Sequence, residues 1–366
     1  MMETLSLHLP KIWLSIIGFL LLYYVVTDGC DLGLGIISLC SGSDQDRKLL
    51  MDVISPVWHG NQTWLVVLGG MLFGAFPPFY SILLSALYLP MLGMIFGFIL
   101  RGVAFEFRGH SRNKAWWILS FGMGSLISAI AQGFALGGLL GGLRVQNGQF
   151  AGGVWDWLNP YAALIAAGVV CGYVMLGAHY AILKTQGRIQ QRSFRYAMAA
   201  SICTLIATIA VHFCTALRYP HVARKWNPIP ELSLMPLFAV LAAASFVAVF
   251  YSLRKRYESA PLIFNIAIIV FSFTGLSLGF YPDMVPGGLA TPVKVMDAAA
   301  SPKTLFFMLV VTGILLPVIV VYHSYTAAVF GGKTQEEYDE NASHKNTQGL
   351  MDTLSRGSKG ATKHPE

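Results

Sequence analysis

The chain has 366 residues, of which 55% are hydrophobic and 12% are charged, and its mean hydropathy is +0.59. A soluble domain carries about twice that charged fraction, so the composition excludes a soluble fold and indicates a protein that crosses a membrane several times. The net charge of +7 does not indicate a nucleic-acid partner, because in a membrane protein the information lies in where the basic residues fall. The five cysteines form no CxxC pair, which favours small buried side chains over a metal site.

Apolar segments of about 20 residues, the length that crosses a bilayer, recur along the chain. We predict nine membrane-spanning helices, at residues 12–38, 55–76, 79–100, 115–140, 158–183, 195–217, 233–253, 262–281 and 304–330. The first third of the second segment is polar, and Pro77 and Pro78 separate it from the third, which predicts a tight hairpin. The expected fold is an all-α transmembrane domain over residues 1–333, followed by a polar, disordered cytoplasmic tail over residues 334–366.

The basic residues predict the orientation of these helices. If the N-terminus lies outside, 18 of the 25 Lys and Arg residues fall in the segments that would face the inside. Positive residues are concentrated in cytoplasmic loops. We therefore expect the N-terminus outside the cell and the C-terminus in the cytoplasm.

Two acidic residues, Asp28 and Asp31, are the only charged residues of the first apolar segment. An acid near the centre of a bilayer costs about 2.5–3.5 kcal/mol on insertion scales, so it is rarely present without a function or a partner. In the predicted orientation both acids lie in the cytoplasmic half of the membrane, as do His59, Arg101 and Glu106 of the next two helices. These five residues are candidates for a proton route. The alternatives for the two acids are a cap or hydrogen bond to a neighbouring helix, or an ion pair with Arg101 that holds helices together.

Other residues allow more than one interpretation. His59 can relay protons, because its pKa lies near neutrality, or it can simply pack near the membrane boundary. Trp58 and Trp64 can anchor the chain at that boundary. His179 and His323 both lie near inner helix ends and could hold a haem between them, but they belong to no recognisable motif. The sequence contains no phosphate-binding, dinucleotide or zinc signature.

Three motifs that contain these residues resemble subunit II of the cytochrome bd-type quinol oxidases, and are closest to the cyanide-insensitive branch. They are Thr27 to Gly35, Pro56 to Trp64 with the segment to Phe76 after it, and Arg101 to Arg108. Weaker similarity is found at Asn159-Pro160, Gly177-Ala178, Leu183 to Thr185, Tyr281-Pro282 and Val318 to Lys333. The resemblance covers residues 10–333.

The resemblance implies a multi-pass subunit of the bacterial inner membrane that pairs with a homologous subunit I of similar nine-helix architecture. In the family, subunit I holds the quinol site and the haems, two of type b and one of type d or a further b, and the complex reduces oxygen to water with protons from the cytoplasm. Subunit II supports this partner, and in some members contributes a proton route and a lateral oxygen path. The resemblance makes Trp58 and Trp64 candidates for that path or for contact with the partner. We expect this chain alone to bind no haem or metal; lipid and a small accessory subunit are further expected partners.

The sequence departs from the family pattern at three positions. The family usually has an acid where this chain has His59, many relatives have Glu where it has Gln62, and Cys30 replaces the phenylalanine usual between the two acids. The acid at the position of His59 is one proposed member of the family's proton route, so the sequence alone does not decide whether this subunit has such a route. The rival interpretation is a secondary transporter, which also places acids in the membrane, but no matched pair of broken helices supports it.

Overall fold

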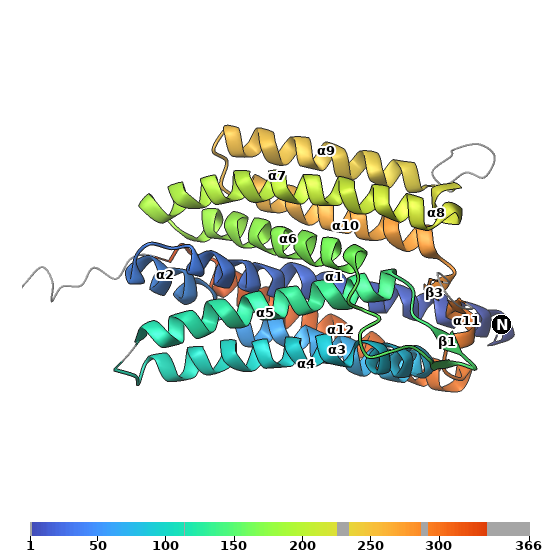
Figure 1. The fold of residues 1–366 in the computed structure, drawn as a ribbon. Helices are drawn as coiled ribbons and strands as arrows, with labels where there is room; N and C mark the ends of the chain where they lie inside the picture. Colours follow the sequence, from blue (N-terminus) through green and yellow to red (C-terminus); the bar gives the residue numbers. More distant parts are fainter. Residues whose placement is uncertain (1, 113, 225–233, 287–291, 335–366) are drawn as a thin grey trace, which may run out of the picture. The chain divides into compact units, whose positions relative to one another are not determined.

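The computed structural model describes residues 2–112, 114–224, 234–286 and 292–334 (Figure 1). Its long helices are α1 (Met2–Leu39), α3 (Trp58–Ala75), α4 (Pro77–Arg108), α5 (Lys114–Leu140), α6 (Pro160–Lys184), α7 (Gly187–Arg218), α9 (Met235–Arg254), α10 (Ala260–Phe280) and α12 (Pro302–Val329). Each corresponds to one predicted span, which confirms the all-α membrane fold.

Eight of these helices, within the described residues, are long and apolar enough to cross a membrane. The other is α3, whose polar start lowers its mean hydropathy, as its sequence indicates. A single residue, Phe76, separates α3 from α4. The predicted tail, residues 334–366, lies outside the described residues except for Thr334.

Helix starts follow from local chemistry. Asn159 and Ser301 each place a side-chain oxygen on a backbone N–H of the first turn, and the residue after each is a proline at the first helical position. Such a cap satisfies an N–H group that has no partner inside the helix, and proline loses nothing there because its missing N–H is not needed. These signals set the starts of α6 and α12.

Several short elements between the spans were not predicted. They are α2 (Asp44–Ile54), α8 (Pro220–Arg224), α11 (Val295–Ala298) and two antiparallel hairpins, β1 (Val145–Gln146) with β2 (Gln149–Phe150) and β3 (Asp283–Val285) with β4 (Val293–Lys294). The first hairpin turns through Asn147 and Gly148, both with positive φ, the Asn-Gly pair that this tight turn favours. Helix α2 begins at a Ser43 cap and buries one apolar face.

Helix α1 packs against α3, α5, α6, α10 and α12. Its closest crossing is with α6, where Gly33 lies against the backbone of Tyr173 and Gly177, so close that a methyl group on either glycine would overlap the other helix. Small residues allow such close contact between membrane helices. Near the other end of α1, Trp13 Nε1 donates a hydrogen bond of 3.0 Å to the Leu305 carbonyl of α12.

The connections at one end of the bundle are joined by ion pairs. The buried Asp46 of α2 pairs with Arg192 of α7 at 2.5 Å, and Glu258, between α9 and α10, pairs with Lys333 after α12 at 2.8 Å. Figure 1 shows α2 at this end, and α8, β1 and α11 at the other. The described connections that the basic residues predict to be cytoplasmic therefore lie together at one end of the helix bundle. Which side of the membrane this end faces stays a prediction.

Candidate functional site

Asp28 of α1 and Arg101 of α4 form an ion pair inside the helix bundle. Asp28 Oδ1 is 2.5 Å from Arg101 Nη2, and both side chains are completely buried. The second oxygen, Oδ2, accepts a 3.0 Å hydrogen bond from the Tyr24 hydroxyl. Two charges taken out of water are tolerated only when they are paired and hydrogen-bonded. The alternative predicted from the sequence, an ion pair with Arg101, therefore describes Asp28.

The hydrogen bonds continue from this pair to two more helices. Gln132 of α5 donates from Nε2 to the Tyr24 hydroxyl at 2.8 Å, and Tyr173 of α6 donates from its hydroxyl to Gln132 Oε1 at 2.6 Å. A continuous polar network thus links α4, α1, α5 and α6 through side chains. These hydrogen bonds hold the side chains of Tyr24 and Tyr173 in place beside Asp28.

Asp31 is also completely buried, but its environment is different. Its Oδ2 accepts a 2.9 Å hydrogen bond from Asn61 Nδ2 of α3, and its Oδ1 has no hydrogen-bond partner among the described residues. The described residues place no cation within ion-pair distance of it, since Arg101 pairs with Asp28. The site therefore holds two carboxyl groups and one guanidinium, and Asp31 is the carboxyl whose charge is not balanced by direct contact.

A second set of hydrogen bonds leads from Asp31 towards the surface. Asn61 Oδ1 lies 3.0 Å from His323 Nε2 of α12, and His323 Nδ1 lies 2.9 Å from the Tyr23 hydroxyl. Because Asn61 Oδ1 is an acceptor, this arrangement assigns the proton of a neutral His323 to Nε2. The imidazole is half-buried, so the series runs from the fully buried Asp31 to the edge of the bundle.

The remaining candidates lie outside this buried network. His59 and Glu106 form a pair with 3.9 Å between Nε2 and Oε1, and their side chains are 72% and 68% exposed. Trp58 is buried and stacks on both His59 and Phe105, at centroid distances of 3.6 and 4.8 Å. The structure brings Asp28, Asp31 and Arg101 together as expected but places His59 and Glu106 on the surface. Their role in proton transfer stays a prediction.

Trp64 has a position that the sequence did not define. It is buried, with its ring centroid 4.3 Å from that of Tyr23 and 5.8 Å from that of His323. It therefore packs beside the hydrogen bonds that lead to Asp31. Whether it also lines an oxygen path stays a prediction.

The histidines considered for haem binding have other partners. Both ring nitrogens of His323 are engaged, by Tyr23 and Asn61, and the buried His179 hydrogen-bonds through Nδ1 to Asn265. Among the residues that the structure describes, no three His, Cys, Asp or Glu side chains gather where they could hold a metal ion. His179 Nε2 is buried without a hydrogen-bond partner among the described residues, and the expectation that this chain binds no haem stays a prediction.

Sequence reasoning missed five polar residues of the network. They are Tyr23, Tyr24, Asn61, Gln132 and Tyr173. Asn61 lay inside a motif that was singled out, and the two tyrosines precede Asp28 by about one helical turn, so spacing could have indicated them. Gln132 and Tyr173 carry no local signal, because only the packing of α5 and α6 against α1 brings them to the site.

Comparisons with known proteins agree with this architecture. The family model for cytochrome bd terminal oxidase subunit II matches residues 9–330. The cytochrome bd-I ubiquinol oxidase subunit 2 of Escherichia coli K12 is 26% identical over 366 residues, covering 90% of this chain and 96% of the relative. The cytochrome bd ubiquinol oxidase subunit 2 of Bacillus subtilis is 25% identical, covering 89% and 96%.

A solved structure has the same fold. A chain of the bd oxidase from Geobacillus thermodenitrificans matches with a TM-score of 0.73 at 18% identity, covering 88% of this chain and 98% of that chain. The comparisons give no support to the transporter interpretation. The long match to the family, together with the eight apolar helices, places the protein in the bacterial cytoplasmic membrane. The chain belongs to the cytochrome bd terminal oxidase subunit II family and is a multi-pass subunit of a bd-type terminal oxidase.

Proposed function

We propose that this chain supports a homologous, haem-bearing subunit I, and that Asp31 takes up protons for the reduction of oxygen by the complex. When bound in the partner, the haems carry electrons from quinol to oxygen. The observation that carries the proposal is Asp31 itself, a completely buried carboxyl group with no cation in contact and one unbonded oxygen. The other members of the site hold this group in place.

The chemistry of the two carboxyl groups supports different roles for them. Asp28 is held by Arg101 and Tyr24, so a change in its protonation would break a buried ion pair. Asp31 can gain or lose a proton at Oδ1 without breaking a hydrogen bond. Asn61 cannot pass a proton as an acid or base does; it fixes the orientation of Asp31 and of His323. We infer that Asp31 is the titrating group and Asp28 the structural one.

The surface formed by α3, the end of α4 and α12 is the best candidate for contact with subunit I. Below we refer to it as the partner face. Among large apolar side chains such as Val66, Ile314 and Val318, it also exposes polar or small groups, namely His59, Thr63, Gly70, Glu106, Tyr322 and Tyr325. Polar side chains at membrane depth usually face protein rather than lipid, and an exposed glycine lets a neighbouring helix approach closely. Nothing in the described chain lies within 4 Å of a methyl group placed on Gly70.

The exposed face of α7 carries fewer polar side chains along its span, as expected for lipid contact. Its most exposed large side chains along the span are all apolar: Ile202, Ile206, Ile209, Phe213 and Leu217. Lipid tails are as apolar as these residues, so such a face needs no protein cover. The half-buried His323 lies on the partner face, and the hydrogen bonds from Asp31 therefore lead towards the proposed partner.

Purification through a tag on this chain tests the proposal. The tagged chain should bring with it a second membrane subunit, and the pair should give haem bands in a reduced-minus-oxidised spectrum and oxidise quinol. Expressed alone, the chain should give no Soret band. A stoichiometric haem in the isolated chain that is lost in His179→Ala would contradict the assignment of the haems to the partner.

A further inference from the structure

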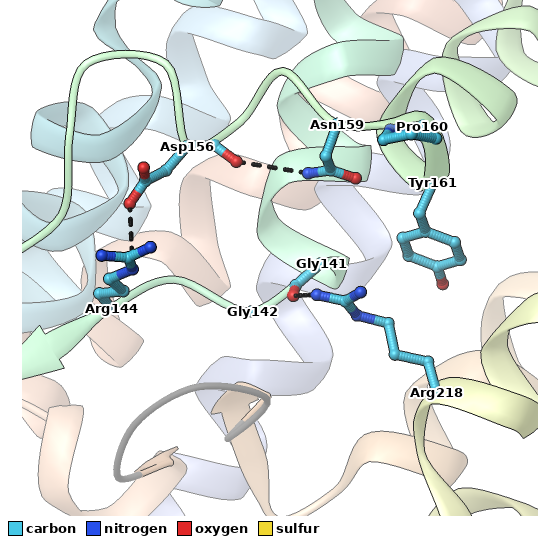
Figure 2. A pocket seen from close by; sticks show the side chains of 8 residues that line it. All are labelled: Gly141, Gly142, Arg144, Asp156, Asn159, Pro160, Tyr161 and Arg218. Atoms are coloured by element: carbon cyan, nitrogen blue, oxygen red, sulfur yellow. Dashed lines mark hydrogen bonds and ion pairs between the residues drawn. The ribbon is translucent and has the colours of Figure 1, made fainter.

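A second polar site lies at the opposite end of the bundle from Asp31, where α5 ends, α6 begins and α7 ends. A cavity of about 390 Å³ opens there, a volume within the range of about 300–1,000 Å³ typical of small-molecule sites. Two arginines line it, Arg144 and Arg218, and in Figure 2 they lie on either side of Gly142. The site takes no part in the network around Asp31.

Arg218 is held in place by the helix ends around it. Its Nη2 donates a 2.6 Å hydrogen bond to the Gly141 carbonyl just beyond α5, and its guanidinium carbon lies 5.8 Å from the centroid of the Tyr161 ring. The chain turns sharply after this carbonyl through Gly142, whose φ of 85° suits glycine. These contacts orient the guanidinium before any ligand arrives.

The cavity carries a net positive charge. Arg144 Nε is 3.5 Å from Asp156 Oδ2, and Asp156 also accepts a 3.0 Å hydrogen bond from the Gly153 N–H. The lining therefore contains two guanidinium groups and one carboxylate. The N-terminus of α6 at Pro160 also lines the cavity, and a helix N-terminus adds partial positive charge. The balance favours an anionic ligand.

The surroundings indicate that this anion has an apolar part. Phe213 and Leu217 of α7, just before Arg218, are 65% and 69% exposed, and Trp155 and Leu158 of the preceding loop are 63% and 51% exposed. Aromatic residues beside basic ones are typical of the membrane–water boundary. A ligand whose phosphate enters the cavity could lay acyl chains along the apolar face of α7.

We propose that the cavity binds the phosphate of an anionic phospholipid such as phosphatidylglycerol, held between Arg144 and Arg218. Arginine binds phosphate oxygens through charge-assisted hydrogen bonds of fixed geometry, and basic pockets between membrane helices bind anionic head groups. Asp156 limits the affinity, because it competes with the phosphate for Arg144. The site fastens lipid to the α5–α6–α7 side of the subunit, away from the partner face.

Native mass spectrometry of the purified complex tests this assignment. Complex exchanged from phosphatidylglycerol nanodiscs into detergent should retain at least one phosphatidylglycerol molecule, and complex from phosphatidylcholine nanodiscs should retain none at this site. Arg144→Gln should lower the retention at least ten-fold, and the double variant with Arg218→Gln should abolish it. Asp156→Asn should retain the lipid at least as well as the unchanged protein. Arg224→Gln, which removes an exposed charge at the same end but outside the cavity, is the matched control.

The Arg144→Gln variant decides the test if the double variant fails to assemble, because Arg144 is 58% exposed and its ion-pair partner, Asp156, lies in the same connection between α5 and α6. Equal retention by Arg144→Gln and Arg224→Gln would overturn the proposal, and so would the absence of retained lipid in the unchanged complex. Binding of inorganic phosphate that depends on Arg144, without retention of phosphatidylglycerol, would overturn the assignment to a lipid.

Discussion

Asp28 and Arg101 are 73 positions apart in the chain, yet their side chains meet at 2.5 Å in the interior of the bundle with no exposure to solvent. This ion pair joins α1 to α4 and sets the level at which Asp31 lies. Among the described residues, Arg101 is the only arginine in contact with either acid, and its charge is paired with Asp28 rather than Asp31.

Loss of one member of this pair should impair assembly. Breaking a buried ion pair costs about 3–5 kcal/mol, because the remaining charge is left unpaired. We expect Arg101→Met to reduce the yield of assembled, haem-loaded complex strongly, whereas Asp28→Asn combined with Arg101→Met should recover a large part of it. Arg254→Met, at an exposed helix end, is the control. A normal yield for Arg101→Met alone would show that the pair does not hold the helices.

The crossing of α1 and α6 should not tolerate a larger residue. A methyl group on Gly177 would overlap the backbone of Gly33 and Leu34, and overpacking of this kind costs about 1–3 kcal/mol. Gly177→Ala should lower the melting temperature of the complex. Gly172→Ala on the same helix has open space around it and should melt like the unchanged protein. Equal melting temperatures for the two variants would contradict the close crossing.

The contact between Glu258 and Lys333 should depend on pH. Hydrogen bonds from Lys333 and Gln190 lower the pKa of the Glu258 carboxyl below its usual value of 4.5. A lowered folded-state pKa stabilises the protein above the unfolded value, and the effect disappears as the pH falls through the folded value. A double-mutant cycle with Glu258→Gln and Lys333→Gln should therefore show a small coupling at pH 7 and a smaller one at pH 3. Equal coupling at both pH values would contradict this assignment.

The orientation can be tested with single cysteines. We expect Lys255→Cys to be labelled by a membrane-impermeant maleimide only in inverted vesicles, and Lys303→Cys only in intact cells, because the basic residues favour the end that carries Lys255 as the cytoplasmic one. A background without the exposed native cysteines is the control. The opposite labelling pattern would place Asp31 in the outer half of the membrane.

The nine spans were predictable because each is an apolar run of membrane length between polar or basic connections. Helix α2 was missed because its amphipathic pattern is short, and the first hairpin because the Asn147-Gly148 signal was not used. Within the site, Asp28, Asp31 and Arg101 stand out as charges in apolar helices. The position of His59 on the surface was not predictable from depth alone, since depth does not determine which face of α3 turns towards Asp31.

The exposed position of His59 also bears on the departure from the family pattern. Its side chain is 72% exposed and lies beside Glu106 rather than Asp31. We therefore expect His59→Asp, which restores the usual acid, to leave quinol oxidase turnover largely unchanged. A large change in turnover with normal haem content would show that the partner face takes part in proton delivery.

The turnover of the Asp31→Asn variant tests the central claim most directly. Asparagine keeps the size and most hydrogen bonds of Asp31 but cannot titrate. Our account predicts that the purified variant complex has normal haem content and an oxygen-consumption rate lowered at least ten-fold. Cys30→Ala, a substitution at the neighbouring position, is the control and should leave the rate unchanged. Full turnover in a fully assembled Asp31→Asn complex, or a loss of assembly in place of turnover, would contradict the assignment of proton uptake to Asp31.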